Sequence, residues 1–309
     1  MFQIADGHCD FLYGAANEGY NLDAPKKRQN VTAAHLLDGG VRLQFFAAWI
    51  DMSLHIPPLQ QCLAMIDAYY EMHDQHPWLL PLTPSARMNN DTGKVFTVLT
   101  VEGGEAIEGS LAVLRVLHRL GVRAMSLTWN DNNELAGAAL ARGNQGLTPL
   151  GCEVVAEMNR IGMAIDVSHL SDAGIDDVLR LSTRPVFASH SNARAVFPSP
   201  RSLSDEHIRA IAACGGTVGV NFYNKQLTRN VNACIDDIVR QIEHICAVGG
   251  VACCAIGSDF DGMPVYPRDL ATSRDFPMLA DALLHAGFSK DEVNRILFEN
   301  LYRFILQFV

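Results

Sequence analysis

The sequence lacks an excess of positive charge. Lysine and arginine together number 24, aspartate and glutamate number 34, and the formal net charge at pH 7 is −10. Neither sign is concentrated in a block along the chain. Proteins that bind nucleic acid neutralise backbone phosphates with clustered basic side chains, so this composition argues against a nucleic-acid partner.

Long apolar segments are missing as well. No apolar run approaches the roughly 18 residues that a membrane-spanning helix needs. The first residues, Met1 to Asp6, lack the basic stretch followed by an apolar stretch that marks a secretion signal. We therefore expect no membrane partner and a cytoplasmic location. The eight cysteines form no C-x-x-C pair and several lie in apolar stretches, so we expect reduced, structural thiols.

Glycine-rich phosphate-binding motifs are absent too. Where a dinucleotide-binding protein carries G-x-G-x-x-G after its first strand, this chain reads Asp6-Gly7-His8-Cys9-Asp10, which argues against a doubly wound open sheet. Hydrophobic residues make up 49% and charged residues 19%, as is typical of a compact globular protein. Because no internal repeat, low-complexity tract or long linker is found, we predict a single domain of residues 1–309.

Short β-rich runs alternate with helical periodicity along the chain, which predicts a (β/α)8 TIM barrel with additional C-terminal helices. The predicted strands are Ile4–Asp10, Val41–Ile50, Val95–Glu102, Arg123–Asn130, Met163–His169, Pro185–His190, Thr217–Tyr223 and Cys253–Asp259. The predicted helices are Val31–Leu37, Leu59–His73, Ala106–Leu120, Gly151–Ile161, Asp172–Leu181, Asp205–Cys214, Ala233–Val248, Phe276–Ala286 and Ser289–Phe308. The Pro-containing segment Met263–Asp275 is predicted to be a long loop.

Side chains that bind metals collect at the predicted strand ends. Catalytic groups of a TIM barrel come from the carboxyl ends of its strands. A single histidine or aspartate there is as easily structural, but the other histidines fall in predicted helices or loops, so the co-location indicates a shared site. Three imidazoles and three carboxylates exceed the needs of one zinc and suit two ions about 3.5 to 4 Å apart. The set is His8, Asp10, Glu102, His169, His190 and Asp259.

These residues lie in short motifs that together resemble the membrane (renal) dipeptidases and their soluble bacterial relatives, the M19 metallopeptidases. The resemblance spans nearly the whole chain, with the motifs in the family's order. They are Asp6-Gly7-His8-Cys9-Asp10, Val101-Glu102-Gly103-Gly104, Asp166-Val167-Ser168-His169, Ser189-His190-Ser191-Asn192-Ala193 and Gly257-Ser258-Asp259-Phe260-Asp261-Gly262.

The resemblance implies a (β/α)8 barrel that holds two zinc ions and hydrolyses dipeptides through a metal-bridging hydroxide. Glu102 would bridge the ions, and Asp259 would accept the proton of the water and pass it to the leaving amine. The ligands of one ion would be His8, Asp10 and Asp259, and those of the other His169 and His190. Asp261 shares the predicted strand face of Asp259, so the choice between them follows the family motif alone.

Substrate contacts are also implied. A guanidinium is the natural clamp for the C-terminal carboxylate of a dipeptide, and Arg201 occupies the family's place for it, with Arg194 as the reserve candidate. Tyr223 is predicted either to contact the substrate or to pack at the rim. Trp129 stands where the mammalian enzymes carry a histidine that polarises the carbonyl, and Asn130 is the predicted substitute donor.

Two further hypotheses stay open on the sequence alone. Another metal-dependent barrel hydrolase would act on a lactam, amide or amidine, but such enzymes usually begin with H-x-H and often use a modified lysine on strand four. This chain has H-x-D and no lysine between Lys94 and Lys225. The second alternative is a metal-stabilised binding protein without catalysis. The preferred dipeptide side chains, the acceptance of a D-residue at the C-terminal position, the native metal and the formation of a homodimer stay open at this stage.

Overall fold

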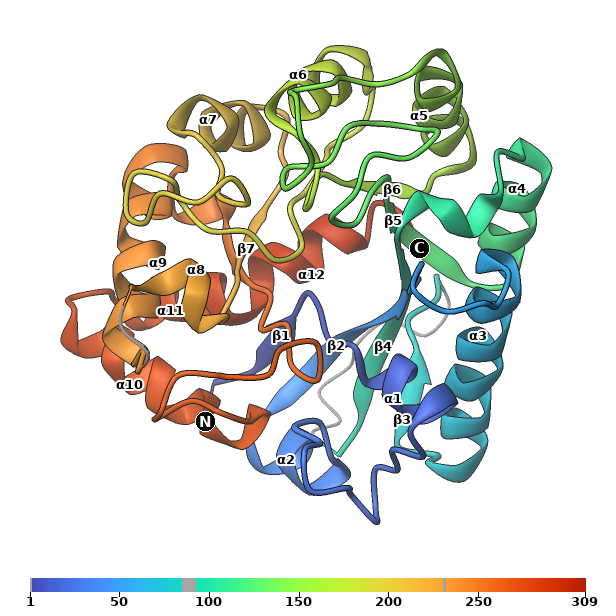
Figure 1. Ribbon diagram of the computed structural model, residues 1–309. Helices are drawn as coiled ribbons and strands as arrows, with labels where there is room; N and C mark the ends of the chain where they lie inside the picture. Colours follow the sequence, from blue (N-terminus) through green and yellow to red (C-terminus); the bar gives the residue numbers. More distant parts are fainter. Residues whose placement is uncertain (1, 85–92, 230–231) are drawn as a thin grey trace.

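The computed structural model describes residues 2–84, 93–229 and 232–309, and it has a curled parallel sheet surrounded by helices (Figure 1). Strands follow one another in the order β6-β5-β4-β2-β1-β8-β7, and β3 pairs with β4 off this path. The strands are β1 (Ile4–Asp6), β2 (Val41–Trp49), β3 (Leu79–Pro81), β4 (Val95–Glu102), β5 (Val122–Ser126), β6 (Ala164–Asp166), β7 (Val218–Val220) and β8 (Cys254–Ile256).

An extended segment, residues 185–190, lies between β6 and β7. Phe187 forms a parallel bridge with Asp166 on β6, and Ala188 forms one with Val218 on β7. The segment therefore occupies the sixth strand position and joins the two ends of the sheet. The predicted (β/α)8 barrel is confirmed.

The same segment corrects one detail of the prediction, because Pro185–His190 is not a regular strand. Its last backbone N–H groups bond to side chains instead of a neighbouring strand. The N–H of Ser189 donates to Asp166 Oδ1 at 3.0 Å, and that of His190 donates to Ser168 Oγ at 3.2 Å. These side-chain acceptors replace the ladder hydrogen bonds and end the pairing after two bridges.

Strands at the site end are shorter than predicted. β1 ends at Asp6, β6 at Asp166 and β8 at Ile256, so His8, His169 and Asp259 lie in the turns that follow. His169 and Asp259 have φ angles of 71° and 63°. A left-handed residue turns the backbone away from a strand, so the turns after β6 and β8 cannot continue the ladder at His169 and Asp259.

The helices agree closely with the predicted ranges, except that short ones were missed and long ones are divided. Ser171 and Ser204 cap α6 and α7, since their hydroxyls accept the backbone N–H groups of Gly174 and His207. The helices are α1 (Phe11–Asn17), α2 (Ala33–Asp38), α3 (Pro58–Gln75), α4 (Leu111–Arg119), α5 (Pro149–Ile161), α6 (Asp172–Leu181), α7 (Asp205–Ala213), α8 (Asn224–Leu227), α9 (Ile235–Gly249), α10 (Phe276–His285), α11 (Lys290–Asn294) and α12 (Asn300–Ile305). Short 3₁₀ turns occupy Gly104–Ile107, Val251–Cys253 and Ser273–Asp275, and a π-helical turn, Arg295–Glu299, joins α11 to α12.

The barrel interior combines small and large side chains. Alternation along β4 turns Phe96 and Val98 into the interior and places Glu102 on the same face at the strand end. The C-terminal helices cover the other end, where Asn300 Nδ2 donates to the carbonyl of Cys254 at 2.8 Å (Figure 1). The carboxyl ends of the strands are thus left for the site. The interior cluster contains Ala5, Leu43, Phe45, Leu82, Phe96, Val98, Ala124, Ala164, Phe187, Ala255, Phe298, Leu301, Phe304, Ile305 and Phe308.

Two glycines make room for the segment that carries His190. A Cβ atom on Gly219 would lie 2.0 Å from the carbonyl oxygen of Ser189, and one on Gly257 would lie 1.8 Å from it. We expect Gly257→Ala to displace this backbone and to lower the free energy of unfolding by about 3 kcal/mol or more, as overpacking does. Thermal denaturation measures the loss. Gly143→Ala, which adds a methyl group in open space at φ +80°, measures the cost of a left-handed alanine without a steric clash. Equal melting temperatures of the two variants would contradict the prediction.

The cysteines are free thiols, as the sequence predicted. Cys9, Cys62, Cys253 and Cys254 are buried. Burial raises the pKa of Cys62 to about 12, so this thiol stays protonated and unreactive at neutral pH.

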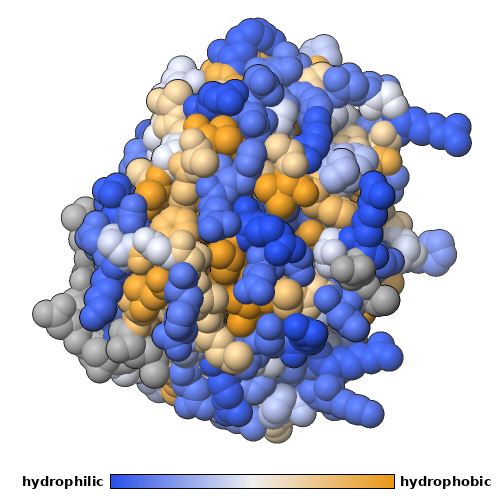
Figure 2. Space-filling view, turned by 90° about the vertical axis from the view of Figure 1, so that its left-hand side faces the viewer, coloured by the Kyte–Doolittle hydropathy of each residue, from blue (hydrophilic) through white to orange (hydrophobic). Residues whose placement is uncertain are grey.

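The surface carries no extended band of apolar side chains in the view of Figure 2. Hydrophilic side chains cover much of this face, and hydrophobic ones form small groups between them. Among the described residues, large apolar side chains exposed by half or more are Met52, Leu140 and Met278, on separate elements. In the three described ranges, no helix has both the length and the apolar character needed to cross a bilayer.

Candidate metal centre and active site

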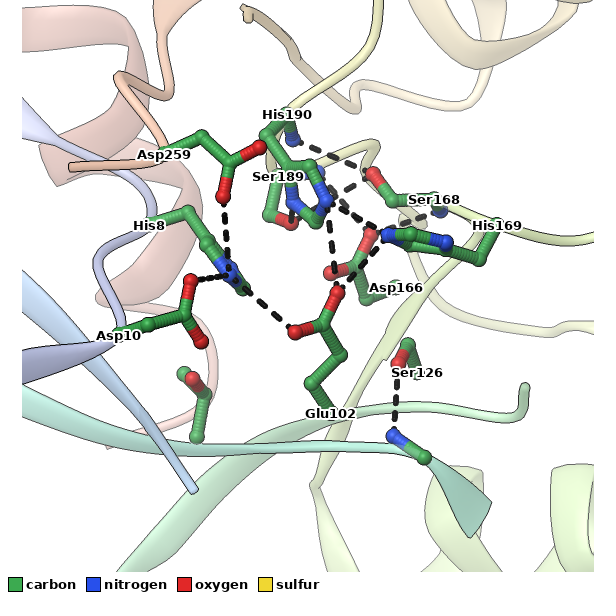
Figure 3. A network of polar contacts seen from close by, with 12 residues as sticks. His8, Asp10, Glu102, Ser126, Asp166, Ser168, His169, Ser189, His190 and Asp259 are labelled. Atoms are coloured by element: carbon green, nitrogen blue, oxygen red, sulfur yellow. Dashed lines mark hydrogen bonds and ion pairs between the residues drawn. The ribbon is translucent and has the colours of Figure 1, made fainter. Parts of the chain in front are cut away.

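Glu102 is the centre of the site. It ends β4 on the inward face and is buried. One carboxylate oxygen, Oε2, lies 3.5 Å from His8 Nε2. The other, Oε1, lies 2.8 Å from His169 Nε2 and 3.5 Å from His190 Nε2 (Figure 3). A single carboxylate therefore contacts all three of the predicted ligand histidines, with one oxygen on each side of the site.

Asp10 and Asp259 complete the set that the sequence predicted. Asp10 Oδ2 lies 3.4 Å from His8 Nε2, and Asp259 Oδ1 lies 3.9 Å from the same atom (Figure 3). Donor atoms form three overlapping groups, each within 4.8 Å. These are His8 with Asp10 and Glu102, Glu102 with His169 and His190, and His8 with His190 and Asp259. The first two groups share Glu102. Asp259 forms the third group with one histidine from each of the first two, His8 and His190.

The ring nitrogens fit a metal. His169 Nδ1 lies 3.0 Å from Asn130 Oδ1 and donates to it, while His190 Nδ1 lies 2.7 Å from Ser189 Oγ. Their Nε2 atoms face each other at 2.9 Å. His8 Nε2 and Asp10 Oδ1 are buried and have no hydrogen-bond partner in the part of the chain that the structure describes. Buried polar atoms without partners are costly, and ligand histidines are commonly fixed through their second nitrogen, so this donor set fits divalent cations.

The pKa values of the three histidines differ. Burial and the positive charge of Arg201 lower the pKa of His169 to about 4, and burial lowers the pKa of His190 well below its ordinary value. Both rings are therefore neutral at pH 7, with a lone pair available. Burial would also lower the pKa of His8, but the charges of Glu102 and Asp10 raise it well above its ordinary value. The carboxylates thus favour positive charge at this point.

Asp261, which sequence geometry could not separate from Asp259, has a different environment. Its carboxylate accepts the backbone N–H of Asn30 at 2.5 Å and that of Val31 at 3.2 Å. Burial raises the pKa of Asp261 to about 7, although these two hydrogen bonds act in the opposite direction. Asp261 therefore anchors the loop before α2, while Asp259 faces His8.

Of the two candidate arginines, Arg201 has the unpaired guanidinium. It is 5% exposed, it bonds only to Ser191 Oγ at 3.4 Å and the carbonyl of His190 at 3.3 Å, and within the described ranges it forms no ion pair. Arg194 instead forms a two-pronged ion pair with Asp172 at 2.7 and 2.6 Å. A buried cation without an anion favours an anionic ligand.

Of the remaining predicted residues, Asn130 contacts the cluster directly, whereas Tyr223 is linked to it through Asn221. Asn130 accepts a hydrogen bond from the ring of His169, a contact that the sequence reasoning did not include. Tyr223 is half-buried before α8, and its backbone N–H donates to Asn221 Oδ1 at 2.6 Å. Asn221, which sequence reasoning missed, donates from Nδ2 to Asp259 Oδ2 at 2.8 Å. Its only sequence signal was a polar residue two positions before Tyr223 in an otherwise apolar strand.

Aromatic side chains form one wall of the site. The ring centroids of Tyr13 and Trp49 are 4.8 Å apart, as are those of Trp49 and Trp129. The cavity that they enclose with four of the cluster residues has a volume of about 210 Å³. A larger cavity of about 520 Å³ beside α6 includes none of the six cluster residues. The smaller cavity is lined by Asp10, Tyr13, Glu18, Trp49, Glu102, Trp129, His169, Asp259, Asp261, Gly262 and Met263.

Comparison with protein families and curated proteins gives a consistent result. The family model described as membrane dipeptidase (peptidase family M19) matches residues 1–308. Dipeptidase 3 of Mus musculus is 32% identical over 319 residues, which cover 99% of this chain and 64% of that protein. Dipeptidase 3 of Homo sapiens is 31% identical over 318 residues, covering 99% and 65%. The chain thus spans slightly less than two thirds of the length of these relatives.

Solved structures resemble it along nearly their whole length. A crystal structure described as dipeptidase AC, a metallopeptidase of family M19, has 28% identity and a TM-score of 0.90, covering 99% of this chain and 98% of that one. A metallopeptidase from Rhodobacter sphaeroides, liganded with a phosphinate mimic of the dipeptide L-Ala-D-Ala, has 26% identity and a TM-score of 0.89, covering 100% and 99%.

Proposed function

The chain belongs to the membrane dipeptidase family, peptidase family M19, and from this premise we propose that it is a dinuclear zinc dipeptidase. The observation that carries the proposal is the position of Glu102, whose two oxygens face two separate groups of ligand-type side chains. A carboxylate so placed suits a bridge between two ions.

The donor set supports zinc. Imidazole nitrogens and carboxylate oxygens are its usual protein ligands besides thiolates, and no thiol belongs to the groups. One ion would be held by His8, Asp10 and Asp259, the other by His169 and His190, with Glu102 in contact with both. When bound, zinc supplies Lewis acidity toward a carbonyl oxygen and makes water more acidic, which favours hydrolysis near neutral pH.

Two residues of the chain act on the substrate. Arg201 binds the C-terminal carboxylate of the dipeptide, because no carboxylate of the described residues forms an ion pair with its buried guanidinium. Asp259 accepts a proton from the attacking water and delivers it to the leaving amine. Asn221 holds one oxygen of Asp259 and leaves the other directed at the cluster, so the base keeps one orientation.

The size of the cavity supports small dipeptides as substrates. About 210 Å³, with an aromatic wall on one side, leaves little room for bulky side chains. The ligand of the Rhodobacter sphaeroides relative mimics L-Ala-D-Ala, so we include dipeptides with a D-residue at the C-terminal position.

The proposal is tested on a panel of L,L and L,D dipeptides. We expect release of free amino acids by zinc-loaded protein, fastest for alanine-sized side chains, and loss of turnover after chelation with recovery on adding zinc. Failure to hydrolyse any member, in a sample shown to contain zinc, would remove the proposal. Equal turnover of a cyclic amide that has no carboxylate would favour the alternative of another barrel hydrolase.

Arg201→Ala is expected to weaken substrate binding by about 2–5 kcal/mol, which raises KM about 30-fold or more, because a buried charge pair is lost. The specific readout is a dipeptide whose C-terminal carboxylate is converted to an amide. The unmodified enzyme should strongly prefer the free acid, and the variant should lose that preference. Arg194→Ala is the matched control, since Asp172 already occupies its guanidinium. A variant that keeps the preference would show that Arg201 is not the clamp.

A further inference from the structure

We propose that two buried aspartates outside the ligand set, Asp6 and Asp166, are positioning residues that each hold one half of the metal site. The inference rests on the proposed metal site but does not depend on which substrate is hydrolysed. Each of the two carboxylates joins the backbone of two ligand-bearing turns, and the two turns that it joins belong to the same half.

Asp6 connects the turn of His8 to the turn of Asp259. Its Oδ1 accepts the backbone N–H of Ser258, next to Asp259, at 2.8 Å and that of His8 at 3.4 Å. Its Oδ2 accepts Ser258 Oγ at 2.6 Å and Gln44 Nε2 at 3.0 Å. The carboxylate is fully buried, so it fixes the ends of β1 and β8 to each other without competition from water.

Asp166 has the same arrangement on the opposite side. Its Oδ1 accepts the backbone N–H of Ser168, next to His169, at 2.9 Å and that of Ser189, next to His190, at 3.0 Å (Figure 3). The hydroxyl of Ser168 also accepts the backbone N–H of His190 at 3.2 Å. Asp166 therefore replaces the missing strand pairing between β6 and the 185–190 segment, and it sets the distance between the two histidines.

The two networks are separate. Apart from the bond from Gln44 on β2, the hydrogen bonds of Asp6 go to the turns of His8 and Asp259, and those of Asp166 go to the turns of His169 and His190. Loss of either carboxylate should loosen the two turns that it joins and leave the other pair in place. Removal of a residue that hydrogen-bonds to metal ligands typically lowers metal affinity 10- to 100-fold. The loss of Asp6 or Asp166 should therefore lower the affinity for one of the two ions by about that factor.

The experiment is a zinc titration of metal-free full-length protein against a chromophoric chelator, with metal content measured in parallel. Asp6→Asn and Asp166→Asn keep the side-chain volume but replace one acceptor oxygen with an N–H donor. Each variant is expected to bind one zinc ion with wild-type affinity and the other 10- to 100-fold more weakly. The ligand variants His8→Ala and His169→Ala identify which half is affected. Asp6→Asn should change zinc binding little when added to His8→Ala, and it should weaken binding of the remaining ion 10- to 100-fold when added to His169→Ala.

Asp237→Asn is the matched control. Asp237 is also buried and accepts a backbone N–H, that of Cys234 at 2.9 Å, but it lies at the start of α9, outside the ligand turns. This variant should lose stability and keep both zinc affinities. If an asparagine variant at Asp6 or Asp166 fails to fold, Ser258→Ala and Ser168→Ala each remove a hydroxyl from the same networks, with an expected loss of about 2- to 10-fold for one ion.

Several outcomes would overturn the inference: equal weakening of both ions by each variant, no weakening by either, or wild-type protein that binds fewer than two ions. Wild-type protein that binds two ions but hydrolyses no dipeptide would remove the proposed function and leave the positioning roles intact. The binding readout therefore separates the two proposals.

Discussion

Replacement of Glu102 by glutamine is expected to remove tight binding of both zinc ions and to lower kcat/KM by about 10³-fold or more. Glu102 is the residue shared by the two donor groups on either side of the site. Glutamine keeps the volume but lacks the charge, and its amide would place an N–H donor against either His8 or the pair His169 and His190. Metal ions supply several kcal/mol of transition-state stabilisation, and about 4 kcal/mol corresponds to a factor of 10³.

Metal content and dipeptide hydrolysis of the purified variant, measured with and without added zinc, check this expectation. Glu105→Gln is the matched control, because Glu105 follows three residues later in the 3₁₀ turn and belongs to none of the donor groups. It should keep two ions per chain. A Glu102→Gln protein with two tightly bound ions and normal turnover would contradict the bridging role.

The order of the secondary structure and the position of Glu102 at the end of a strand could be predicted from the sequence because both follow from simple periodicity, whereas its bridging position was implied only by the family resemblance. Alternation along Val95–Glu102 places the glutamate on the face of the inward Phe96 and Val98. Parallel strands meet at one rim, which brings residues at distant strand ends together. The clustering of metal-ligand side chains at the carboxyl ends of the strands could therefore be predicted without knowing the conformation of the turns that follow.

The local geometry of the other ligands could not be predicted in this way. His8 and Asp10 fall in the predicted strand Ile4–Asp10, yet β1 ends at Asp6 and Asp10 precedes α1. They still meet at 3.4 Å because a turn, not a pleat, brings them together. Asp259 and Asp261 are both left-handed, a conformation that leaves no periodic signal in a single sequence, so strand alternation could not distinguish them.

Short elements and the partners of the ligands were missed for a related reason. The strand Leu79–Pro81 and the helix Asn224–Leu227 have 3 and 4 residues, too few for a periodic pattern. Asn130, Asn221 and Asp166 support ligands through contacts with residues far away in the chain. A buried polar residue in a strand shows that some partner exists, but the identity of that partner depends on the closed fold.

Asp259→Asn is expected to lower kcat by about 10²- to 10⁴-fold, the usual contribution of a general acid-base residue, with a much smaller change in KM. Asn221 Nδ2 donates to one oxygen of Asp259. In the variant the single amide oxygen would turn toward that donor, so the amide N–H group would face His8 and the cluster. The side chain then has no acceptor left for the proton of water. Arg201 and the five remaining metal-ligand candidates are unchanged.

Steady-state kinetics with parallel zinc analysis separate a lost base from a lost metal site, because four ligand-type residues and Glu102 remain in the variant. Asp261→Asn is the matched control: it removes a buried carboxylate two residues away that holds the backbone of Asn30 and Val31. That variant should unfold at a lower temperature and keep a kcat near that of the wild type. If the two variants lost turnover equally, the site would depend on the shape of the whole turn, and Asp259 would not be its base.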